Sequence, residues 1–185
     1  ISTQIASAIS HAHKNHIIHR DIKPENIFVS RFGEFKLGDF GIARELERTM
    51  SGLSKKGTYS YMAPEMYKGE AYDSRVDIYS LGIVLYKLRN HNRLPFISLE
   101  KQLITYRDKE TALARRMAGE KMPAPVNASA SFSHIILKAC AYEPGKRYRK
   151  PEDMLRDLEK LRLAPVNAEK EWEKSQWELT NSAEL

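Results

Sequence analysis

Residues 19–26 read His-Arg-Asp-Ile-Lys-Pro-Glu-Asn, and this stretch decides how the rest of the chain is interpreted. It places the Asp21 carboxylate, the Lys23 ammonium and the Asn26 amide within six residues, and Pro24 blocks helix continuation. A carboxylate can accept a proton, an ammonium can sit against an anionic group, and hard cations prefer carboxylate and amide oxygens. The stretch therefore predicts a polar loop that carries chemistry.

The residues that follow this loop change their periodicity. Residues 27–29 and 34–37 predict two short strands, and residues 30–33 between them form a hairpin-sized connection that contains a glycine. Residues 39–64 have no sustained periodicity and include many hydroxyl side chains, which predicts one long loop. A loop of about 25 residues inside a compact domain is uncommon and usually functional.

Two triplets mark the ends of this long loop: Asp39-Phe40-Gly41 begins it and Ala63-Pro64-Glu65 closes it. With residues 19–26, in this order and at these separations, they resemble the protein kinase family, whose catalytic loop, metal-binding triplet and end of the activation segment they would be. The resemblance covers residues 1–163 and is to the C-terminal lobe of the kinase fold. It implies a mainly α fold, with helices around a buried central helix and a short two-stranded β-hairpin next to the catalytic loop. Residues 164–185 are expected to form an acidic tail or linker.

Helical periodicity agrees with such a lobe. Apolar residues within 1–16 recur at the spacing of one buried helical stripe. Residues 76–88 are apolar on nearly every side, which predicts a helix buried all round. Residues 99–118 look helical but irregular. Two further helices are expected at 132–140 and from Pro151, where a proline and two acids open the first turn.

The resemblance gives a role to each polar residue of the site. Asp21 would accept the proton of the acceptor hydroxyl, and Lys23 would contact the transferred phosphoryl group of ATP. Asn26 and Asp39 would bind Mg²⁺, a hard cation that takes oxygen ligands. Taken singly, Asp21 could be a turn aspartate and Lys23 a surface lysine, but the whole constellation favours the functional interpretation.

The position of Lys23, two residues after Asp21, and the pair Gly57-Thr58 resemble kinases of the serine/threonine type. Thr58 would hydrogen-bond Asp21 and Lys23 in that arrangement. The implied activity is that of an ATP-dependent protein serine/threonine kinase, with ATP and Mg²⁺ as cofactors. It would transfer the γ-phosphate of ATP to Ser/Thr hydroxyls of protein substrates.

Arg20, next to Asp21, indicates control by phosphorylation of the activation segment, because a guanidinium at this place favours a bidentate contact with phosphate. The candidate acceptors are Thr49, Ser51 and Ser54, although each can equally be an ordinary loop hydroxyl. An upstream kinase, or the protein acting on itself, would then be a partner.

Further residues are expected to support the site. Asp77, at the start of the apolar helix, is expensive to bury unless it is hydrogen-bonded, and by resemblance it would hold the backbone of residues 19–21. Glu65 and Arg147 resemble the buried ion pair of the family. His19 and Phe40 would pack in a hydrophobic column beneath the site.

Composition excludes several classes of protein. The 185 residues carry 30 Lys+Arg against 24 Asp+Glu, a net charge of +6, but the basic residues are scattered without interleaved aromatics, so no nucleic-acid partner is expected. The single cysteine, Cys140, excludes an intrachain disulfide and fits a reducing, cytoplasmic location. The longest apolar run, residues 78–88, is short of the ~20 residues of a membrane-spanning helix, so no membrane segment is expected. His11, His13 and His16 lack a cysteine or acid at ligand spacing, which argues against a metal site there.

The sequence contains neither a Gly-x-Gly-x-x-Gly loop nor a Val-Ala-x-Lys strand, which in the family belong to the N-terminal lobe that covers the ATP phosphates. Because the chain begins at Ile1 inside a helical pattern, we expect a fragment without this lobe that is inactive alone. Two other classes stay open: a protein-docking or regulatory kinase-like module without catalysis, which would use residues 89–125 and the tail, and a small-molecule phosphotransferase. The four polar residues of the site argue against the first, and the complete Ala-Pro-Glu segment argues against the second.

Overall fold

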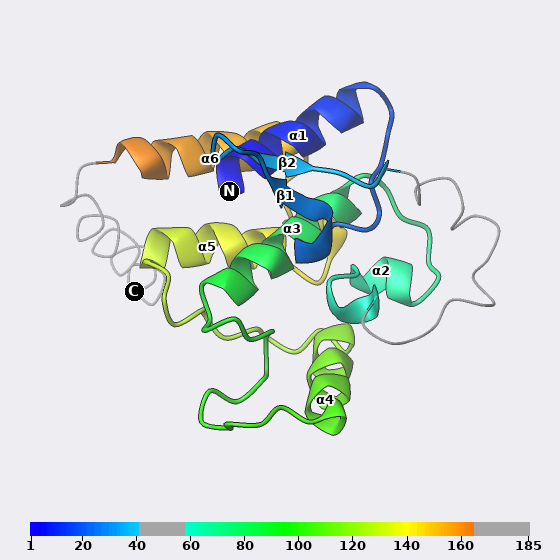
Figure 1. Cartoon of the computed structure of the whole chain (residues 1–185). Coiled ribbons are helices and arrows are strands. Elements are labelled where there is room, and N and C mark those ends of the chain that lie inside the picture. Colours follow the sequence, from blue (N-terminus) through cyan, green and yellow to red (C-terminus); the bar gives the residue numbers. More distant parts are fainter. Residues whose placement is uncertain (41–57, 165–185) are drawn as a thin grey trace, which may run out of the picture.

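The computed structural model describes residues 1–40 and 58–164. In these ranges six α-helices and one two-stranded sheet make up the fold (Figure 1). Their bounds are α1 Ser2–Lys14, β1 Ile27–Val29, β2 Phe35–Leu37, α2 Pro64–Tyr67, α3 Arg75–Leu88, α4 Tyr106–Met117, α5 Ala130–Ala139 and α6 Pro151–Leu163. Short 3₁₀ turns lie at Pro24–Asn26, Thr58–Ser60 and Pro144–Lys146. The predicted fold class, mainly helical with one β-hairpin, is confirmed.

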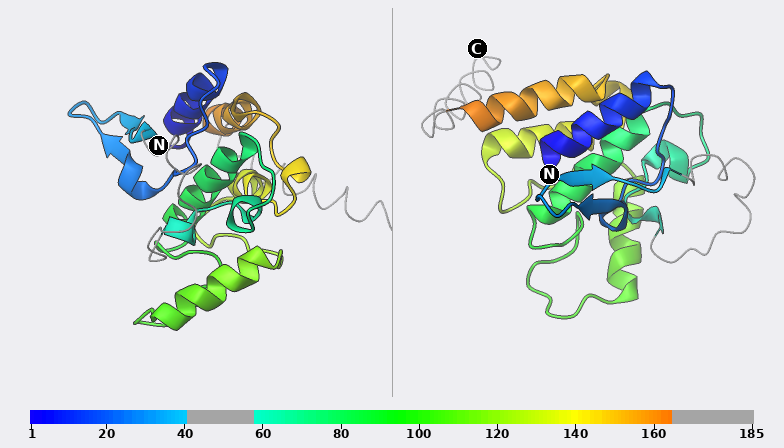
Figure 2. Two further views of the ribbon diagram at one scale, coloured as in Figure 1. Left: turned by 90° about the vertical axis from the view of Figure 1, so that its right-hand side faces the viewer. Right: turned by 45° about the horizontal axis from the view of Figure 1, so that its top comes forward.

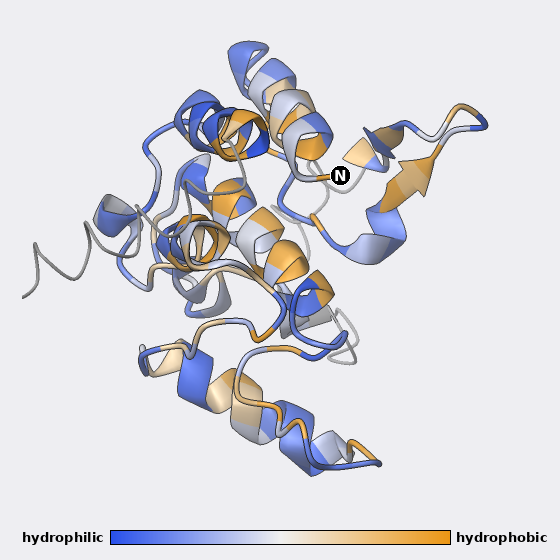
Figure 3. Cartoon of the chain, turned by 90° about the vertical axis from the view of Figure 1, so that its left-hand side faces the viewer, coloured by the Kyte–Doolittle hydropathy of each residue, from blue (hydrophilic) through white to orange (hydrophobic). Residues whose placement is uncertain are grey.

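Helix α3 forms the centre of the hydrophobic core. Every residue from Val76 to Tyr86 is buried, as expected for a helix with apolar side chains on nearly all sides. Helix α5 packs against α3, and α6 packs along α1 (Figure 1). Hydrophobic residues are concentrated on these inner helices (Figure 3). The helices predicted at 76–88, at 132–140 and from Pro151 correspond to α3, α5 and α6.

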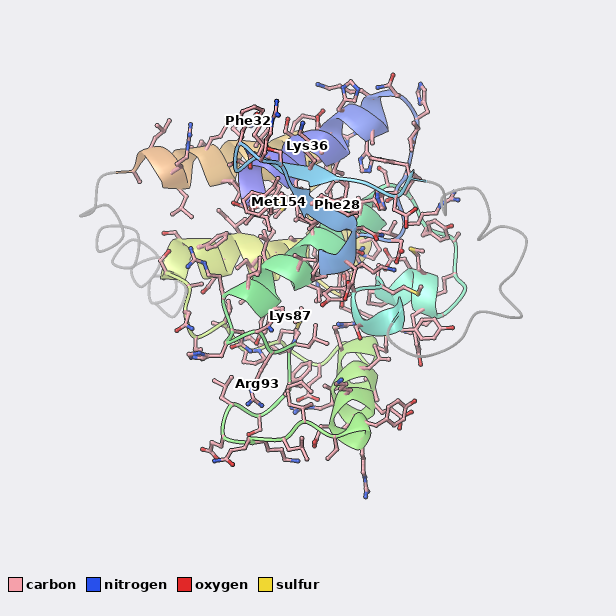
Figure 4. All side chains as sticks on the ribbon, viewed as in Figure 1. Phe28, Phe32, Lys36, Lys87, Arg93 and Met154 are labelled. Carbon is pink, nitrogen blue, oxygen red and sulfur yellow. The ribbon has the colours of Figure 1, made fainter. Side chains whose placement is uncertain are left out.

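Strands β1 and β2 pair antiparallel, with Ile27 opposite Leu37. The hairpin lies beside α1, where the Gln4 side-chain oxygen accepts a hydrogen bond from the Phe35 backbone N–H at 3.1 Å (Figure 2). Phe28 and Phe32 on this hairpin are exposed (Figure 4). The hairpin therefore leaves an apolar surface next to the end of the polar loop.

Helix α4 is shorter than the sequence indicated. We predicted helix over 99–118, but α4 begins at Tyr106, and residues 99–105 form a loop. Thr105 and Asp108 form a capping box, in which each side chain accepts a hydrogen bond from the backbone N–H of the other residue. Because a capping box satisfies the free N–H groups of a first turn, it sets the start of the helix.

Two local features escaped the sequence prediction. Arg93, in the segment before α4 (Figure 4), donates hydrogen bonds to the carbonyl oxygens of Ser98 and Lys101, which holds that segment as a loop. Helix α2, which was not predicted, begins at Pro64, the last residue of the predicted loop 39–64, and continues to Tyr67. Its four residues are too few for a periodic pattern to be recognised.

Residues 41–57, most of the predicted long loop, lie outside the described residues, and so do residues 165–185 of the predicted tail. Both predictions therefore stay predictions. Within the ranges that the structure describes, no helix combines the length and the apolar character that crossing a bilayer requires.

Candidate active site

The polar loop of residues 19–26 is fastened to the first turn of α3 by Asp77. The carboxylate accepts hydrogen bonds from the backbone N–H groups of His19 and Arg20, at 2.8 Å on different oxygens. Asp77 is only 1% exposed. A buried carboxylate is costly without such donors, so these two bonds compensate its burial and fix the start of the loop.

His13 is a supporting residue that the sequence did not reveal. Its Nε2 lies 2.8 Å from the Asp77 carboxylate oxygen that also binds the His19 N–H. The sequence gave His13 only the rejected metal role, and in the described ranges no group of three or more histidines, cysteines or acids could hold a metal ion. The only signal in the sequence was that a buried Asp77 needs several hydrogen-bond donors. That requirement does not identify which residue of the chain supplies them.

His19 connects the polar loop to the segment that begins at Gly38. Its Nδ1 accepts a hydrogen bond from the Asp21 backbone N–H at 3.3 Å, which leaves the ring proton on Nε2. Nε2 then donates to the Gly38 carbonyl oxygen at 2.8 Å. The His19 ring also meets the Phe40 ring edge-on, with centroids 4.7 Å apart. The expected column of these two rings is present, and it places the Asp21 loop against the residues around Asp39.

Asp21, Lys23 and Asn26 come together at the centre of the loop. The Lys23 ammonium donates to Asp21 Oδ2 at 2.6 Å, and Asn26 Nδ2 donates to the same oxygen at 3.1 Å and to the Asp21 carbonyl oxygen at 2.8 Å. Both side-chain contacts fall on Oδ2, so Oδ1 is the oxygen that these neighbours leave for another group. Asp21 and Asn26 are buried, so the carboxylate is held in one orientation.

Asn26 and Asp39 are brought near each other through the backbone. The Gly38 N–H donates to the Asn26 carbonyl oxygen at 3.0 Å, which sets Asp39, the next residue, beside the loop. The Asn26 amide uses Nδ2 for both of its contacts with Asp21, so its side-chain oxygen faces other groups. The Asp39 carboxylate is exposed. Carboxylate and amide oxygens are the ligand types that a hard cation such as Mg²⁺ prefers.

Two residues of the site have a strained backbone. Arg20 has φ 67° and Asp39 has φ 60°, in the left-handed region that side chains other than glycine rarely adopt. Such conformations persist only where surrounding contacts impose them, and they cluster at functional sites. At Arg20 the imposing contact is the N–H bond to Asp77, and the guanidinium lies 5.7 Å from the centre of the Tyr72 ring.

Glu65 and Arg147 form the ion pair expected from the sequence, away from the polar loop. Arg147 Nη1 and Nη2 donate to the two carboxylate oxygens at 2.6 and 2.7 Å, in a bidentate arrangement. Their side chains are 6% and 0% exposed respectively. The Arg147 guanidinium also lies 4.8 Å from the centre of the Tyr79 ring, and burial raises the pKa of Tyr79 above its usual value. The pair ties the start of α2 to the segment before α6.

The remaining candidates cannot be placed. Thr49, Ser51 and Ser54 lie outside the described residues. Thr58 belongs to the 3₁₀ turn Thr58–Ser60, but its side chain is outside the description, so its bonds to the loop stay a prediction.

The sequence of this chain is similar to those of known protein kinases. A model of the protein kinase domain matches residues 1–157. The serine/threonine-protein kinase PrkC of Bacillus subtilis is 40% identical over 162 residues, which cover 85% of this chain and 24% of PrkC. The serine/threonine-protein kinase PknB of Mycolicibacterium smegmatis is 34% identical over 165 residues, which cover 85% of this chain and 25% of PknB. The chain thus spans about a quarter of the length of the curated relatives it matches.

Proposed function

Because the chain belongs to the protein kinase family, we propose that it is part of a serine/threonine protein kinase that transfers the γ-phosphate of ATP to hydroxyls of protein substrates. Its relatives PrkC and PknB are named serine/threonine-protein kinases. The observation that carries the proposal is the Asp21 carboxylate, which Lys23 and Asn26 hold through one oxygen on a loop fastened to buried Asp77.

Asp21 is the residue that orients the acceptor hydroxyl in this proposal. Phosphoryl transfer needs the attacking oxygen in line with the γ-phosphate, and a carboxylate in one orientation can receive the hydroxyl proton while it holds that line. Oδ1 is the oxygen assigned to this task, since the contacts of Lys23 and Asn26 fall on Oδ2. The Lys23 ammonium adds a positive charge where negative charge develops on the transferred group.

Asn26 and Asp39 are the residues assigned to Mg²⁺. Their oxygens have the chemistry of hard-cation ligands, and the backbone bond from Gly38 to Asn26 keeps the two residues close. Bound Mg²⁺ would neutralise charge on the phosphates of ATP. The exposed Phe28 ring packs closely against Gly38, where a Cβ would lie 2.7 Å from a ring carbon, so a larger residue there would displace the ring.

Arg20 is assigned to regulation. The hydrogen bond to Asp77 holds the Arg20 backbone in the left-handed conformation, so the side chain starts from a backbone position that is fixed. A phosphate on Thr49, Ser51 or Ser54 would pair with it through charge-assisted bonds and order the activation segment. An upstream kinase, or a second molecule of the same protein, would supply that phosphate.

The test is a phosphoryl-transfer assay on a chimera in which the residues of PrkC that precede its matching region are placed before Ile1. This supplies the Gly-rich loop and strand lysine that the present sequence does not contain. With labelled ATP and a serine- and threonine-containing protein, the chimera should label substrate, and Asp21→Asn should reduce the rate roughly 10²–10⁴-fold. The matched control is Glu34→Gln, which changes an exposed carboxylate in the hairpin and should leave the rate unchanged.

A docking module without catalysis is the second candidate. Leu99, Leu103 and Tyr106, at and before the start of α4, are exposed apolar side chains, and such groups mark interaction surfaces when they are contiguous. The same chimera separates the two candidates. A folded chimera that binds ATP and Mg²⁺ but labels no protein would support the docking module and contradict the kinase.

A further inference from the structure

Helix α3 ends in a basic turn that contains none of the proposed catalytic or metal-binding residues. Between Asp77 and Glu100 the chain has no acid, and seven positions within this stretch hold three cations, Lys87, Arg89 and Arg93. The C-terminus of a helix contributes only about half a negative charge, so these residues leave its end positive. Residues 87–93 are called the basic turn below.

The three cations of the basic turn contact only neutral groups. Within the described part of the chain, no carboxylate forms an ion pair with any of them. Lys87 donates to the Tyr61 hydroxyl at 3.0 Å, and Arg93 donates to two backbone carbonyl oxygens. The exposed Arg89 guanidinium lies 5.3 Å from the centre of the Phe132 ring. The turn therefore keeps its positive charge.

The backbone of the basic turn has a fixed shape. His91 and Asn92 have φ values of 50° and 59°, in the left-handed region. The buried Asn90 side chain holds the turn, because it donates to the Arg93 carbonyl oxygen at 3.2 Å and accepts from the Val126 N–H at 3.4 Å. A preformed surface of this kind loses little conformational freedom when a partner binds.

Two exposed apolar side chains accompany these charges. Leu88 lies within the basic turn, and Val126 lies in the segment that is hydrogen-bonded to it. The Asn127 N–H in that segment also donates to the Arg89 carbonyl oxygen at 2.8 Å, so the two stretches of chain lie side by side. Cations beside exposed apolar groups fit an acidic segment that carries large apolar side chains.

Residues 165–185 of this chain have that chemistry. They contain five glutamates against two lysines, a net charge of −3, and both tryptophans of the chain, Trp172 and Trp177. Glutamates adjoin both tryptophans, and Trp172 has one on each side. The segment therefore offers negative charge and aromatic surface at the same positions.

This segment follows α6 at the end of the molecule where the basic turn lies. Helices α3 and α6 both end, and α5 begins, on that side (Figures 1 and 2). The basic turn contacts α5 through Arg89 and Phe132, and α5 packs on α6. The eight residues from Pro165 to Trp172 extend up to about 26 Å, at about 3.3 Å per residue. That is longer than the 13 residues of α6, which span about 20 Å, so the segment is long enough to reach the turn.

A second basic run, residues 146–150, is a poorer match. It precedes α6, at the opposite end of that helix from residue 165. Two of its cations are already paired, Lys146 with Glu143 and Arg147 with Glu65. The basic turn is therefore the surface that suits an acidic segment better.

We propose that residues 169–178 dock on the basic turn of the same molecule. Their glutamate side chains contact the three cations of the turn, and their tryptophan rings cover Leu88 and Val126. The contact covers the end of α3 and does not depend on the phosphoryl transfer proposed for the polar loop.

Tryptophan fluorescence of the full chain tests the docking directly, because both tryptophans lie in the segment that docks. Acrylamide, an uncharged quencher, should quench the parent chain weakly at low salt. Quenching should increase at about 1 M salt, where screening shortens the reach of exposed charges to about 3 Å. Quenching at low salt as strong as that of free N-acetyltryptophanamide, or quenching that does not change with salt, would overturn the proposal.

Charge reversal identifies the surface. Arg89→Glu should lower the ratio of docked to free segment roughly fivefold, as expected for the loss of an exposed charge contact. Arg31→Glu is the matched control, because Arg31 is another exposed arginine over an aromatic ring, that of Phe32 on the hairpin, and it should leave quenching unchanged. The double substitution Glu171→Lys and Glu173→Lys should expose the tryptophans as Arg89→Glu does. Combined with Arg89→Glu, it should restore part of their protection.

Protein concentration separates docking within one molecule from association of two. Quenching should not depend on concentration, and protection that develops only as the concentration rises would assign the contact to a second copy and overturn the proposal. Equal effects of Arg89→Glu and Arg31→Glu would show that net charge, and not the basic turn, governs the tryptophans, which would also overturn it. The salt and concentration series use the parent chain, so they decide the matter even if a variant does not fold.

Discussion

Removal of Arg147 is the most demanding test of how this fold is held together. Arg147 makes two bonds to Glu65, donates from Nε to the Ala141 carbonyl at 2.7 Å and from Nη2 to the Tyr142 carbonyl at 3.0 Å. Arg147→Ala leaves the Glu65 carboxylate buried without its counter-charge and two carbonyl oxygens without their donor. Breaking one side of a buried ion pair costs about 3–5 kcal/mol, so we expect the free energy of unfolding to fall by that amount.

The measurement is equilibrium unfolding in urea, followed by far-ultraviolet circular dichroism and extrapolated to water. Arg115→Ala is the matched control, because Arg115 and Glu120 form a bidentate pair of the same kind with side chains 43% and 46% exposed. A surface pair contributes about 0–1 kcal/mol, so the control should hardly change stability. Because both pairs are bidentate Arg–Glu pairs, a difference between the two stability changes measures the effect of burial.

A double-mutant cycle completes the test. Once Arg147 has been replaced by alanine, Glu65→Ala removes an unpaired buried charge, so its additional destabilisation should be small or reversed in sign. The reasoning would be refuted if Arg147→Ala lowered stability no more than Arg115→Ala, or if the effects of the two single substitutions simply added.

Three further perturbations test other parts of the structure. Cys140 should resist alkylation by iodoacetamide in the folded chain at neutral pH and react after unfolding in urea, because burial raises its thiol pKa to about 12; labelling at the rate of a free thiol would contradict this. Gly82→Ala would place a Cβ 2.5 Å from Cys140 Sγ, so it should lower the free energy of unfolding by about 1–3 kcal/mol, whereas Gly145→Ala, with open space around it, should cost far less. Hydrogen bonding from Ser10 lowers the pKa of Glu152 below its ordinary 4.5, so this contact stabilises the fold above that pH and is lost as pH falls through the lowered value. Ser10→Ala should therefore shift the urea midpoint at pH 7 and progressively less as the pH falls below 4.5, and a shift that does not change with pH would count against the contact.

The elements that the sequence predicted well are those with a strong local signal. Helix α3 was predictable because its apolar run is too continuous for a surface helix. Helix α6 was predictable because its first turn contains a proline and two acids. The start of α4 was missed because residues 99–105 carry helix-like spacing, while the capping box at Thr105 decides the boundary through two specific hydrogen bonds. Periodicity describes which face is apolar and is a poor guide to where a helix begins.

The candidate site was predictable in its residue types and only partly in its assembly. Motif spacing identified Asp21, Lys23 and Asn26, which lie within one short loop, so local chain geometry already keeps them close. The contact between His13 and Asp77 joins residues that are 64 positions apart in the sequence, and no pattern within either helix predicts it. Contacts of this kind arise from the packing of α1 against α3, which the sequence of one element does not contain.

The charged residues buried in this fold have a feature in common that explains their presence. Asp77, Glu65, Arg116 and Arg147 are each almost inaccessible to water, and the partners of each lie on other elements or connecting segments. Hydrophobic residues of similar size would often stabilise a core equally well, so stability alone does not account for them. What these groups add is hydrogen bonds that orient particular backbone and side-chain groups. Asp77 fixes two backbone N–H groups of the polar loop, while Arg116 and Arg147 fix the backbone or carboxylate of residues 59–65. These buried charges therefore hold the polar loop and residues 59–65 in fixed positions, and such precise positioning is what the proposed phosphoryl transfer would require.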